Sequence, residues 1–194
     1  MNHGTVVGVD AEGARLPMRH LFDLGHRRVA HLTRHGEAME REGAALAVRL
    51  TTYLDEMSRT GRESHIQVLH TRSTDDVPQA TTGLLDSADA PTAIFAAHDD
   101  LAFEGLRAVK ERGLDADQLS VVGYDDVRIA SHPGISPTTV DQSGDDLGRR
   151  AVRLLLERIE GRVAARREQT EPRLVVRGRP LRAAPTRRRQ RARG

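Results

Sequence analysis

Ser120-Val-Val-Gly-Tyr-Asp-Asp126 is the stretch that decides the fold. A short β-branched run that ends on a glycine and then on two carboxylates is typical of a buried strand with acids at its C-terminal edge. The upstream stretch Pro91-Thr-Ala-Ile-Phe-Ala-Ala-His-Asp-Asp100 has the same design, and a helical pattern follows it directly. In open α/β sheets, ligands bind at the carboxyl ends of the strands. We therefore expect both strands to bring their acids to one place.

Strand-like apolar runs alternate with helical patterns along the rest of the chain. We expect strands at residues 5–9, 28–33, 65–70, 92–97, 119–123, 138–140 and 173–177. Helices are expected at residues 12–24, 40–59, 79–86, 101–112 and 144–160, the first closed by Gly25 and the second by Gly61. Pro17 should sit in a first turn or kink its helix, because an interior proline loses a hydrogen bond. The alternation predicts right-handed βαβ units and a mostly parallel, doubly wound α/β sheet.

The expected helix over residues 144–160 is amphipathic. Its apolar residues Leu147, Ala151, Leu154, Leu155 and Ile159 fall on one face. Asp145 and Asp146 lie in its opening turn, where carboxylates complement the helix dipole. For this pair of acids, a structural role is favoured over acid–base chemistry.

The length and composition of the chain limit the class of protein. With 194 residues, the chain suits one large domain or two small lobes, and it would bury roughly 70% of its unfolded surface. Cysteine is absent, which excludes a disulfide framework and a thiolate zinc site. The first residues do not resemble a signal peptide, and no apolar run is long enough to cross a bilayer. These features favour a cytoplasmic protein without a membrane segment.

The basic character of the chain comes from its end. The pI is about 9.6 and the formal net charge is +2, but residues 186–194 hold five arginines and no acid, so the preceding residues carry −3. We expect residues 182–194 to form a solvated, disordered arginine-rich tail. The alternative is a non-specific contact with phosphate groups.

The sequence offers little support for catalysis or for a cofactor. It has no Gly-x-x-x-x-Gly-Lys loop, no Gly-x-Gly-x-x-Gly after the first strand and no Gly-x-Ser-x-Gly elbow. Paired carboxylates such as Asp99-Asp100 can do acid–base work or hold a cation, but adjacent residues on a strand point in different directions. His26, His31 and His35 do not share one face of a strand, which disfavours a metal site. We therefore expect no catalytic residue, no metal and no cofactor.

A set of polar residues remains at the expected strand ends. It consists of Asp10, His98, Asp99, Asp125 and Asp126, joined by Arg49 and Gln142. Such a set suits a ligand rich in hydroxyls, because a carboxylate accepts from two adjacent hydroxyls while an arginine donates to their oxygens. At roughly 1.5–3 kcal/mol per charge-assisted bond, against an association cost of several kcal/mol, three such bonds would bind weakly. Useful affinity would therefore need two lobes that close around the ligand.

Several phrases of the sequence, in order, resemble the effector-binding part of LacI/GalR-type transcriptional regulators. They are Val7-Gly-Val-Asp10, Leu24-Gly-His-Arg-Arg-Val-Ala30, Pro91-Thr-Ala-Ile-Phe-Ala-Ala-His-Asp99, Ser120-Val-Val-Gly-Tyr-Asp-Asp126, Thr138-Thr-Val-Asp-Gln142 and Leu174-Val-Val-Arg-Gly178. The resemblance implies a two-lobed periplasmic-binding-protein-like fold, a homodimer, and a small effector in the cleft between the lobes, usually a sugar or a nucleobase-type metabolite. By position it implies five effector contacts, namely Asp10, Arg49, His98, Asp125 and Gln142.

The chain also departs from the pattern of this family. His98 stands where the family usually has asparagine, Thr52 replaces a usual glycine, and the segment around Arg72 lacks the aromatic that commonly stacks on a sugar. A histidine charged near neutral pH at position 98 would favour an acidic effector.

The resemblance begins partway through the first lobe, so we expect the helix-turn-helix headpiece and the opening βα units of that lobe to be missing. We accordingly expect a fragment or a truncated reading frame, which would meet operator DNA only through the missing headpiece. The expected division is a partial first lobe at residues 1–61, a second lobe at 62–140, a closing helix and strand that cross between the lobes at 141–181, and the tail at 182–194.

The function implied is that of an effector-sensing core without enzyme activity, in which the ligand closes the lobes and alters DNA binding. Two alternatives remain open. One is a solute-binding protein of a transport system, which shares the fold, and the other is a sugar-processing hydrolase that uses the aspartate pairs.

Overall fold

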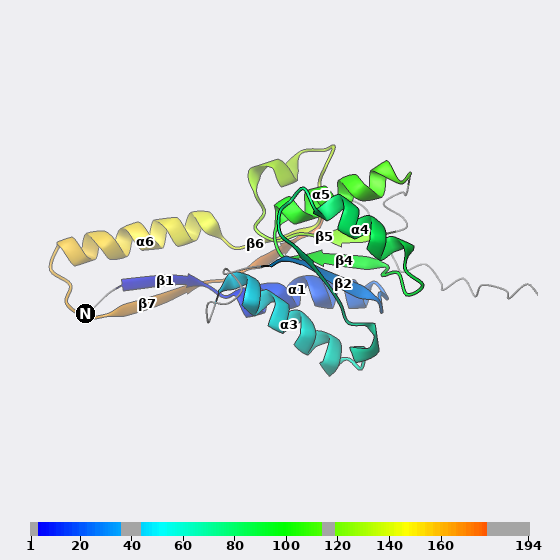
Figure 1. Ribbon diagram of the computed structural model, residues 1–194. Coiled ribbons are helices and arrows are strands. Elements are labelled where there is room, and N and C mark those ends of the chain that lie inside the picture. Colours follow the sequence, from blue (N-terminus) through cyan, green and yellow to red (C-terminus); the bar gives the residue numbers. More distant parts are fainter. Residues whose placement is uncertain (1–3, 36–43, 114–118, 178–194) are drawn as a thin grey trace, which may run out of the picture.

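The structure is a computed structural model that describes residues 4–35, 44–113 and 119–177 (Figure 1). Its strands are β1 (Gly4–Gly8), β2 (Val29–Arg34), β3 (Gln67–Thr71), β4 (Ala93–Ala96), β5 (Ser120–Val122), β6 (Thr139–Asp141), β7 (Arg166–Thr170) and β8 (Arg173–Val175). Its helices are α1 (Asp10–Asp23), α3 (Ala45–Arg59), α4 (Val77–Asp86), α5 (Asp99–Glu111) and α6 (Gly144–Ile159), with short 3-10 turns η1 (Glu63–His65) and η2 (Arg128–Ser131).

Four parallel strands form the central sheet, in the order β3-β2-β4-β5. On one side of β2, Leu32 pairs with Leu69 of β3, and on the other side Leu32 pairs with Ala96 of β4. All four residues of β4 are buried, as expected for a strand that has neighbours on both edges and helices over both faces. The parallel α/β sheet predicted from the sequence is confirmed.

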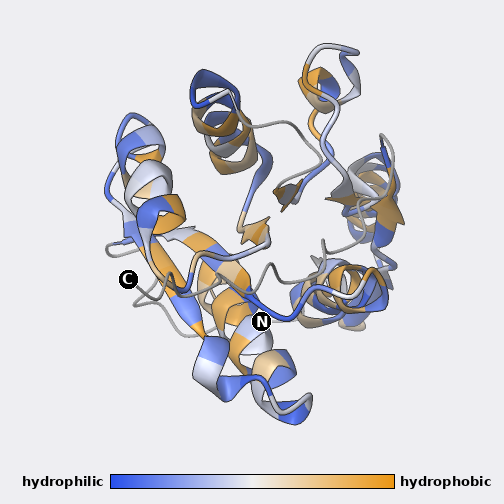
Figure 2. Cartoon of the chain, turned by 90° about the vertical axis from the view of Figure 1, so that its right-hand side faces the viewer, coloured by the Kyte–Doolittle hydropathy of each residue, from blue (hydrophilic) through white to orange (hydrophobic). Residues whose placement is uncertain are grey.

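Two helix layers cover this sheet. On one face, Met18 and Leu21 of α1 and Tyr53 of α3 pack with Phe95. On the other face, the helices α4 and α5 pack over a second apolar cluster that includes Ile94 of β4. In Figure 2, hydrophobic residues gather on the strands and on one side of the helices. The doubly wound arrangement is therefore also confirmed.

A second part of the molecule extends away from this body (Figure 1). It consists of the parallel pair β1 and β7 with α6 alongside, and we call these three elements the arm. The antiparallel pair β6 and β8 joins the body, where a parallel bridge from Val122 to Thr138 continues the central sheet.

The predicted lobe boundary after residue 61 is wrong. The strand β2, before that boundary, is hydrogen-bonded to β3 and β4, which follow it, so residues on both sides of the boundary share one sheet. The chain instead passes between the body and the arm next to Val9, between Asp141 and Gly144, and between Thr170 and Arg173. The predicted tail at residues 182–194 lies outside the described residues.

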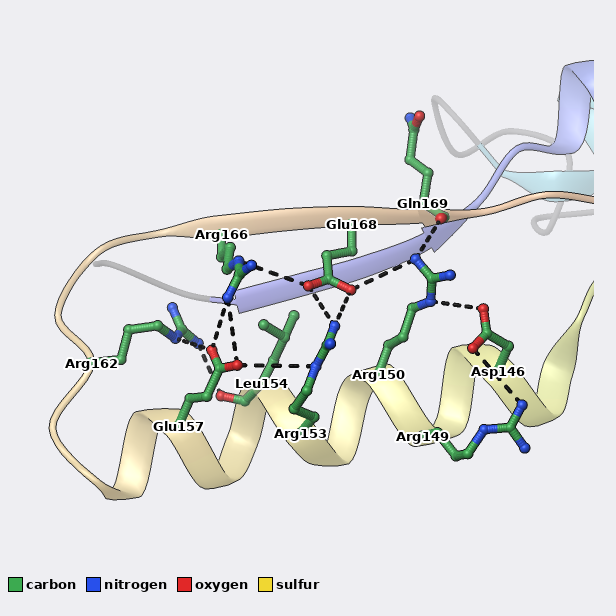
Figure 3. Close-up of polar contacts among 10 residues, drawn as sticks. All are labelled: Asp146, Arg149, Arg150, Arg153, Leu154, Glu157, Arg162, Arg166, Glu168 and Gln169. Carbon is green, nitrogen blue, oxygen red and sulfur yellow. Dashed lines mark hydrogen bonds and ion pairs between the residues drawn. The ribbon is translucent and has the colours of Figure 1, made fainter.

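The contacts of α6 differ from those expected of its apolar face. Among its described residues only Leu154 is buried, whereas Leu155 is 59% and Ile159 is 72% exposed. The side of α6 that faces β7 is charged: Arg153 lies 2.5 Å from Glu168, and Glu157 lies 3.4 Å from Arg166 (Figure 3). Ion pairs thus hold the arm together where apolar packing was expected.

Local details also differ from the predicted pattern. The helix α1 begins at Asp10, and Pro17 is buried in its interior, so this proline does not lie in the first turn. The predicted stop at Gly25 is confirmed, because its φ of 89° is a conformation that favours glycine. Asp145 and Asp146 lie in the first turn of α6, as predicted.

Candidate ligand-binding site

Arg49 is at the centre of the candidate site. It lies on α3 with only 5% of its side chain exposed, and its Nε and Nη2 both donate to Oδ1 of Asp10, at 3.0 and 2.8 Å. Its Nη1 donates to the carbonyl of Ala97 at 2.6 Å and lies 3.5 Å from Oδ1 of Asp125. A buried guanidinium is stable when it is paired and hydrogen-bonded in this way. Arg49 therefore joins the start of α1 to the ends of β4 and β5.

Asp125 occupies a strained turn after β5. Its φ is 112° and that of Asp126 is 51°, values that non-glycine residues rarely adopt. The turn is held by the backbone N–H of Asp125, which donates to Val140, and by Arg177, which pairs with Asp126 at 2.6 Å. Gln142 donates from Nε2 to Oδ1 of Asp125 at 2.5 Å. Backbone strain of this kind is often found where a side chain is presented to a ligand.

The unused hydrogen-bond acceptors of Asp10 and Asp125 indicate a binding role. The side chains of Asp10 and Asp125 are 24% and 30% exposed, and among the described residues no hydrogen bond reaches Oδ2 of either. Burial raises the pKa of Asp125 to about 6, although the charge of Arg49 opposes this shift. Two carboxylate oxygens thus remain as open acceptors for hydroxyl groups.

His98 lies next to this group, at the N-terminal cap of α5. It directly follows Ala97, whose carbonyl binds Arg49. Burial lowers its pKa, the positive charges of Arg34 and Arg49 lower it further, and Asp100 opposes the shift. Both effects disfavour the charged form of the His98 imidazole.

The structure therefore brings together Asp10, Arg49, Asp125 and Gln142 in one hydrogen-bonded and ion-paired chain, with His98 beside it. Asp99, from the same polar set, has a different position. Its carboxylate is fully buried and accepts from Thr139 Oγ1 at 2.6 Å and from the N–H of Val127 at 2.9 Å. These bonds make Asp99 part of the scaffold that fixes the turn at Asp125.

Tyr124 belongs to the site although the sequence did not indicate it. Its ring is 1% exposed, and the guanidinium carbon of Arg49 lies 3.6 Å from the ring centroid. Such a stack holds a cation in place by electrostatic attraction to the ring face. Its position directly after an apolar strand makes Tyr124 look like an ordinary core residue, so no signal in the sequence pattern separates it from the core.

A hollow of about 820 Å³ opens beside Asp125. It is lined by Asp125, Asp126, Asp141, Ser143, Gly144, Asp145, Asp146, Arg149, Arg150, Gln169, Glu171 and Arg173. These residues come from the turn after β5, from the end of β6 and the first turns of α6, and from the connection between β7 and β8 with its flanking residues. The hollow thus lies where the body meets the arm, and its carboxylates, its arginines and the amide of Gln169 suit a polar ligand.

Two of the three histidines considered as metal ligands, His26 and His31, have structural roles. His26 lies between the hydroxyls of Thr92 and Ser120, at 2.9 and 3.0 Å. His31 is buried, and its Nδ1 lies 3.0 Å from the carbonyl of Phe95. Within residues 4–35, 44–113 and 119–177, no group of three histidine, cysteine or acidic side chains is placed to hold a metal. None of the helices described there is long and apolar enough to span a membrane.

Fold and site define a class: an α/β domain with a polar cluster at the carboxyl ends of parallel strands. The family of periplasmic binding protein-like domains matches residues 18–178. The chain belongs to this family, in the form that serves as the effector-binding domain of LacI-type transcriptional regulators.

Individual relatives agree with this assignment. The chain is 32% identical over 170 residues to the transcriptional repressor PurR of Mannheimia succiniciproducens, covering 86% of this chain and 49% of that protein. A LacI transcriptional regulator from a Rhodococcus species is similar in structure, with a TM-score of 0.81 and 30% identity over 93% of this chain and 65% of the other. A LacI family regulator from Enterococcus faecium with bound ribose gives a TM-score of 0.80 and 25% identity, covering 94% and 66%. The chain spans about half the length of the curated relatives it matches.

Proposed function

We propose that this chain senses a small, hydroxyl-rich metabolite, a sugar or a related compound, and thereby controls a transcriptional regulator. The ligand would lie at the carboxyl edge of the central sheet, beside the hollow between body and arm. DNA binding would be the task of a headpiece that these residues do not include.

The observation that carries the proposal is the chain of contacts from Asp10 through Arg49 and Asp125 to Gln142. Arg49 fixes both carboxylates, so their remaining oxygens are held in place before a ligand arrives. Held acceptors bind adjacent hydroxyls with less loss of side-chain entropy than mobile ones.

The sugar assignment is supported by a relative of similar fold whose structure contains ribose. A binding role is favoured over the hydrolase alternative because Asp10 and Asp125 share one guanidinium between them. A glycoside hydrolase would instead need two carboxyls that face each other across the ligand. The relatives named above are transcriptional regulators, which favours gene regulation over solute transport.

The proposal includes a cytoplasmic location and a homodimer, because this mechanism couples ligand binding to the spacing of paired headpieces. Ligand binding would shift the population of body and arm arrangements, and that shift would change the affinity for operator DNA. Light scattering on the purified chain tests the dimer directly.

Thermal-shift screening with sugars, sugar phosphates, sugar acids and nucleobases tests the ligand class. A compound that binds only the folded state raises the free energy of unfolding, by about 2.7 kcal/mol at a concentration of 100 times Kd. The melting temperature rises as a result. Asp125→Asn should abolish the shift for a compound that stabilises the wild type. The matched control is Asp89→Asn, which changes an exposed aspartate away from the site. A shift that survives Asp125→Asn would place the ligand elsewhere.

A further inference from the structure

Arg34 is a second arginine at the carboxyl edge of the sheet, and the proposed site does not use it. It is the last residue of β2 and is only partly exposed. Its Nε is buried without a hydrogen-bond partner, and the described residues offer its guanidinium no hydrogen bond and no ion pair. A buried donor without a partner costs about 1–3 kcal/mol, so such groups call for an explanation.

The position of Arg34 in the sheet is that of a ligand contact. After β2 the chain moves outward to β3, and it then returns to place β4 on the other side of β2. The helices that follow β2 and β4, namely α3 and α5, cover opposite faces of the sheet. Ligands of open α/β sheets bind in the crevice that such a reversal creates at the carboxyl ends of the strands.

Register places Arg34 beside His98 at this crevice. Leu32 of β2 pairs with Ala96 at the end of β4, and the N–H of Ala97 donates to the carbonyl of Leu32. Arg34 and His98 each come two residues after this last pair, and the charge of Arg34 acts on His98. Arg49 reaches the same strand end through the carbonyl of Ala97. The crevice between β2 and β4 therefore holds one paired guanidinium, Arg49, and one unpaired guanidinium, Arg34.

We propose that Arg34 binds an anionic group of the ligand, a carboxylate or a phosphate, while Asp125 and Gln142 hold its hydroxyls. This inference rests on the proposed function and narrows its ligand class to sugar acids and sugar phosphates. A guanidinium donates two parallel hydrogen bonds to either group, and each such charge-assisted bond is stronger than a neutral one. Arg49 cannot supply this function because its donors already serve Asp10 and Ala97.

The charges around Arg34 agree with this assignment. The cations Arg34 and Arg49 both act on His98, and the opposing carboxylate is that of Asp100, which is exposed in the first turn of α5. The described residues form no ion pair between Asp100 and Arg34. Arg34 thus brings a positive charge that no described ion pair neutralises, next to a hollow that is rich in carboxylates, so the two ends of a bound ligand would differ in charge.

Matched ligand pairs test the inference by calorimetry on the full chain. The pairs are D-ribose with D-ribose 5-phosphate, and D-glucose with D-gluconate and D-glucose 6-phosphate. We expect an anionic member to bind about tenfold or more tightly than its neutral partner. Arg34→Met should remove that advantage and change neutral binding less than about twofold, since it deletes roughly one to two charge-assisted bonds. Arg27→Met, at an exposed arginine before β2 and thus at the opposite edge of the sheet, is the control and should change neither.

A second measurement does not depend on finding a sugar. In an NMR titration with inorganic phosphate, the side-chain Nε–H signal of Arg34, assigned by its loss in Arg34→Met, should move and saturate. An unmoved signal, or equal weakening of charged and neutral ligands by Arg34→Met, would overturn the inference. If phosphate moves the signal while no sugar of any kind binds, the proposed function fails and the anion site stands.

Discussion

The guanidinium carbon of Arg49 lies 3.6 Å from the centroid of the Tyr124 ring, so the residue before Asp125 supports the arginine that pairs with Asp125. This stack should be measurable in both stability and ligand binding. Tyr124→Leu removes the ring face and should cost about 3 kcal/mol of stability, mostly from a lost buried aromatic side chain. Tyr124→Phe keeps the ring face and should retain most ligand affinity. Chemical denaturation and calorimetry on both variants check this, and equal loss of affinity in Phe and Leu would contradict the stack.

Gly13 of α1 gives Tyr124 its space. A Cβ built at Gly13 overlaps the hydroxyl of Tyr124, a ring that is buried and cannot move freely. We expect Gly13→Ala to destabilise the protein by about 1–3 kcal/mol through overpacking. The control is Gly83→Ala on α4, where nothing lies within 4 Å of the new Cβ. That change should stabilise the helix by about 0.5–1 kcal/mol, so urea midpoints of the two variants should move in opposite directions.

The sequence predicts the central sheet well, but it does not by itself predict the contacts of the candidate site. The strand–helix alternation was readable because β2, β4 and β5 are short, buried and apolar, and the sheet they form is the predicted one. The five candidate site residues came from the family resemblance, and four of them now lie in one chain of contacts. Periodicity alone could not have joined Asp10 to Arg49, since their contact spans 39 positions along the chain.

The sequence predicts the secondary structure of the arm less well, for a physical reason. The strand β7 has the sequence Arg166-Arg-Glu-Gln-Thr170, which contains no apolar residue, so no strand was predicted there. It forms because β1 offers a parallel edge and because the acids and arginines of α6 pair with it (Figure 3). Tertiary pairing of this kind overrides local propensity and is not visible in a short window of sequence. The error in the lobe boundary had a similar origin, because the partner of β2 is set by topology.

His31 should make the protein less stable in acid. Burial lowers its pKa to about 3, against 6.5 in an unfolded chain, and the charges of His70 and Arg49 act in the same direction as burial. Between these two pH values the unfolded chain binds a proton that the folded protein excludes, so stability falls as pH drops from 6.5 toward 3. The loss is on the order of 5 kcal/mol when the window has been crossed.

Urea denaturation from pH 7 to pH 3.5 measures this loss. His31→Phe keeps a ring between Tyr53 and Phe95 and should flatten the decline relative to the wild type. His65→Gln, at a half-exposed histidine in η1, should leave the decline unchanged. A decline of equal slope in His31→Phe and wild type would show that His31 does not titrate as described.

We expect the affinity for a ligand to depend on pH through the carboxyl group of Asp125. Its pKa is raised to about 6, mainly by burial, so the carboxylate that accepts from a ligand forms only as pH rises through that value. Affinity for a hydroxyl-rich ligand should therefore increase from pH 5 to pH 7, by about tenfold if the charged form alone binds. Asp125→Asn should bind weakly at both pH values. Calorimetry at the two pH values would contradict this assignment if the wild type bound equally well at both.

The ion pairs of Glu168, on β7, should contribute to the stability of the arm. Its carboxylate is 13% exposed and lies 2.5 Å from Arg153, 3.8 Å from Arg150 and 3.8 Å from Arg166. Because the arm buries little apolar surface, we expect its amides to exchange with deuterium faster than those of β4, which is buried throughout. Glu168→Gln should accelerate exchange in β1, β7 and α6 severalfold, corresponding to about 1 kcal/mol.

Glu104→Gln, which breaks a comparable pair with Arg107 on α5, is the control and should leave exchange in the arm unchanged. Added salt at about 1 M should reproduce part of the Glu168→Gln effect, because it screens the same charges. Equal protection of the arm and of β4 would mean that ion pairs are not what limits its stability.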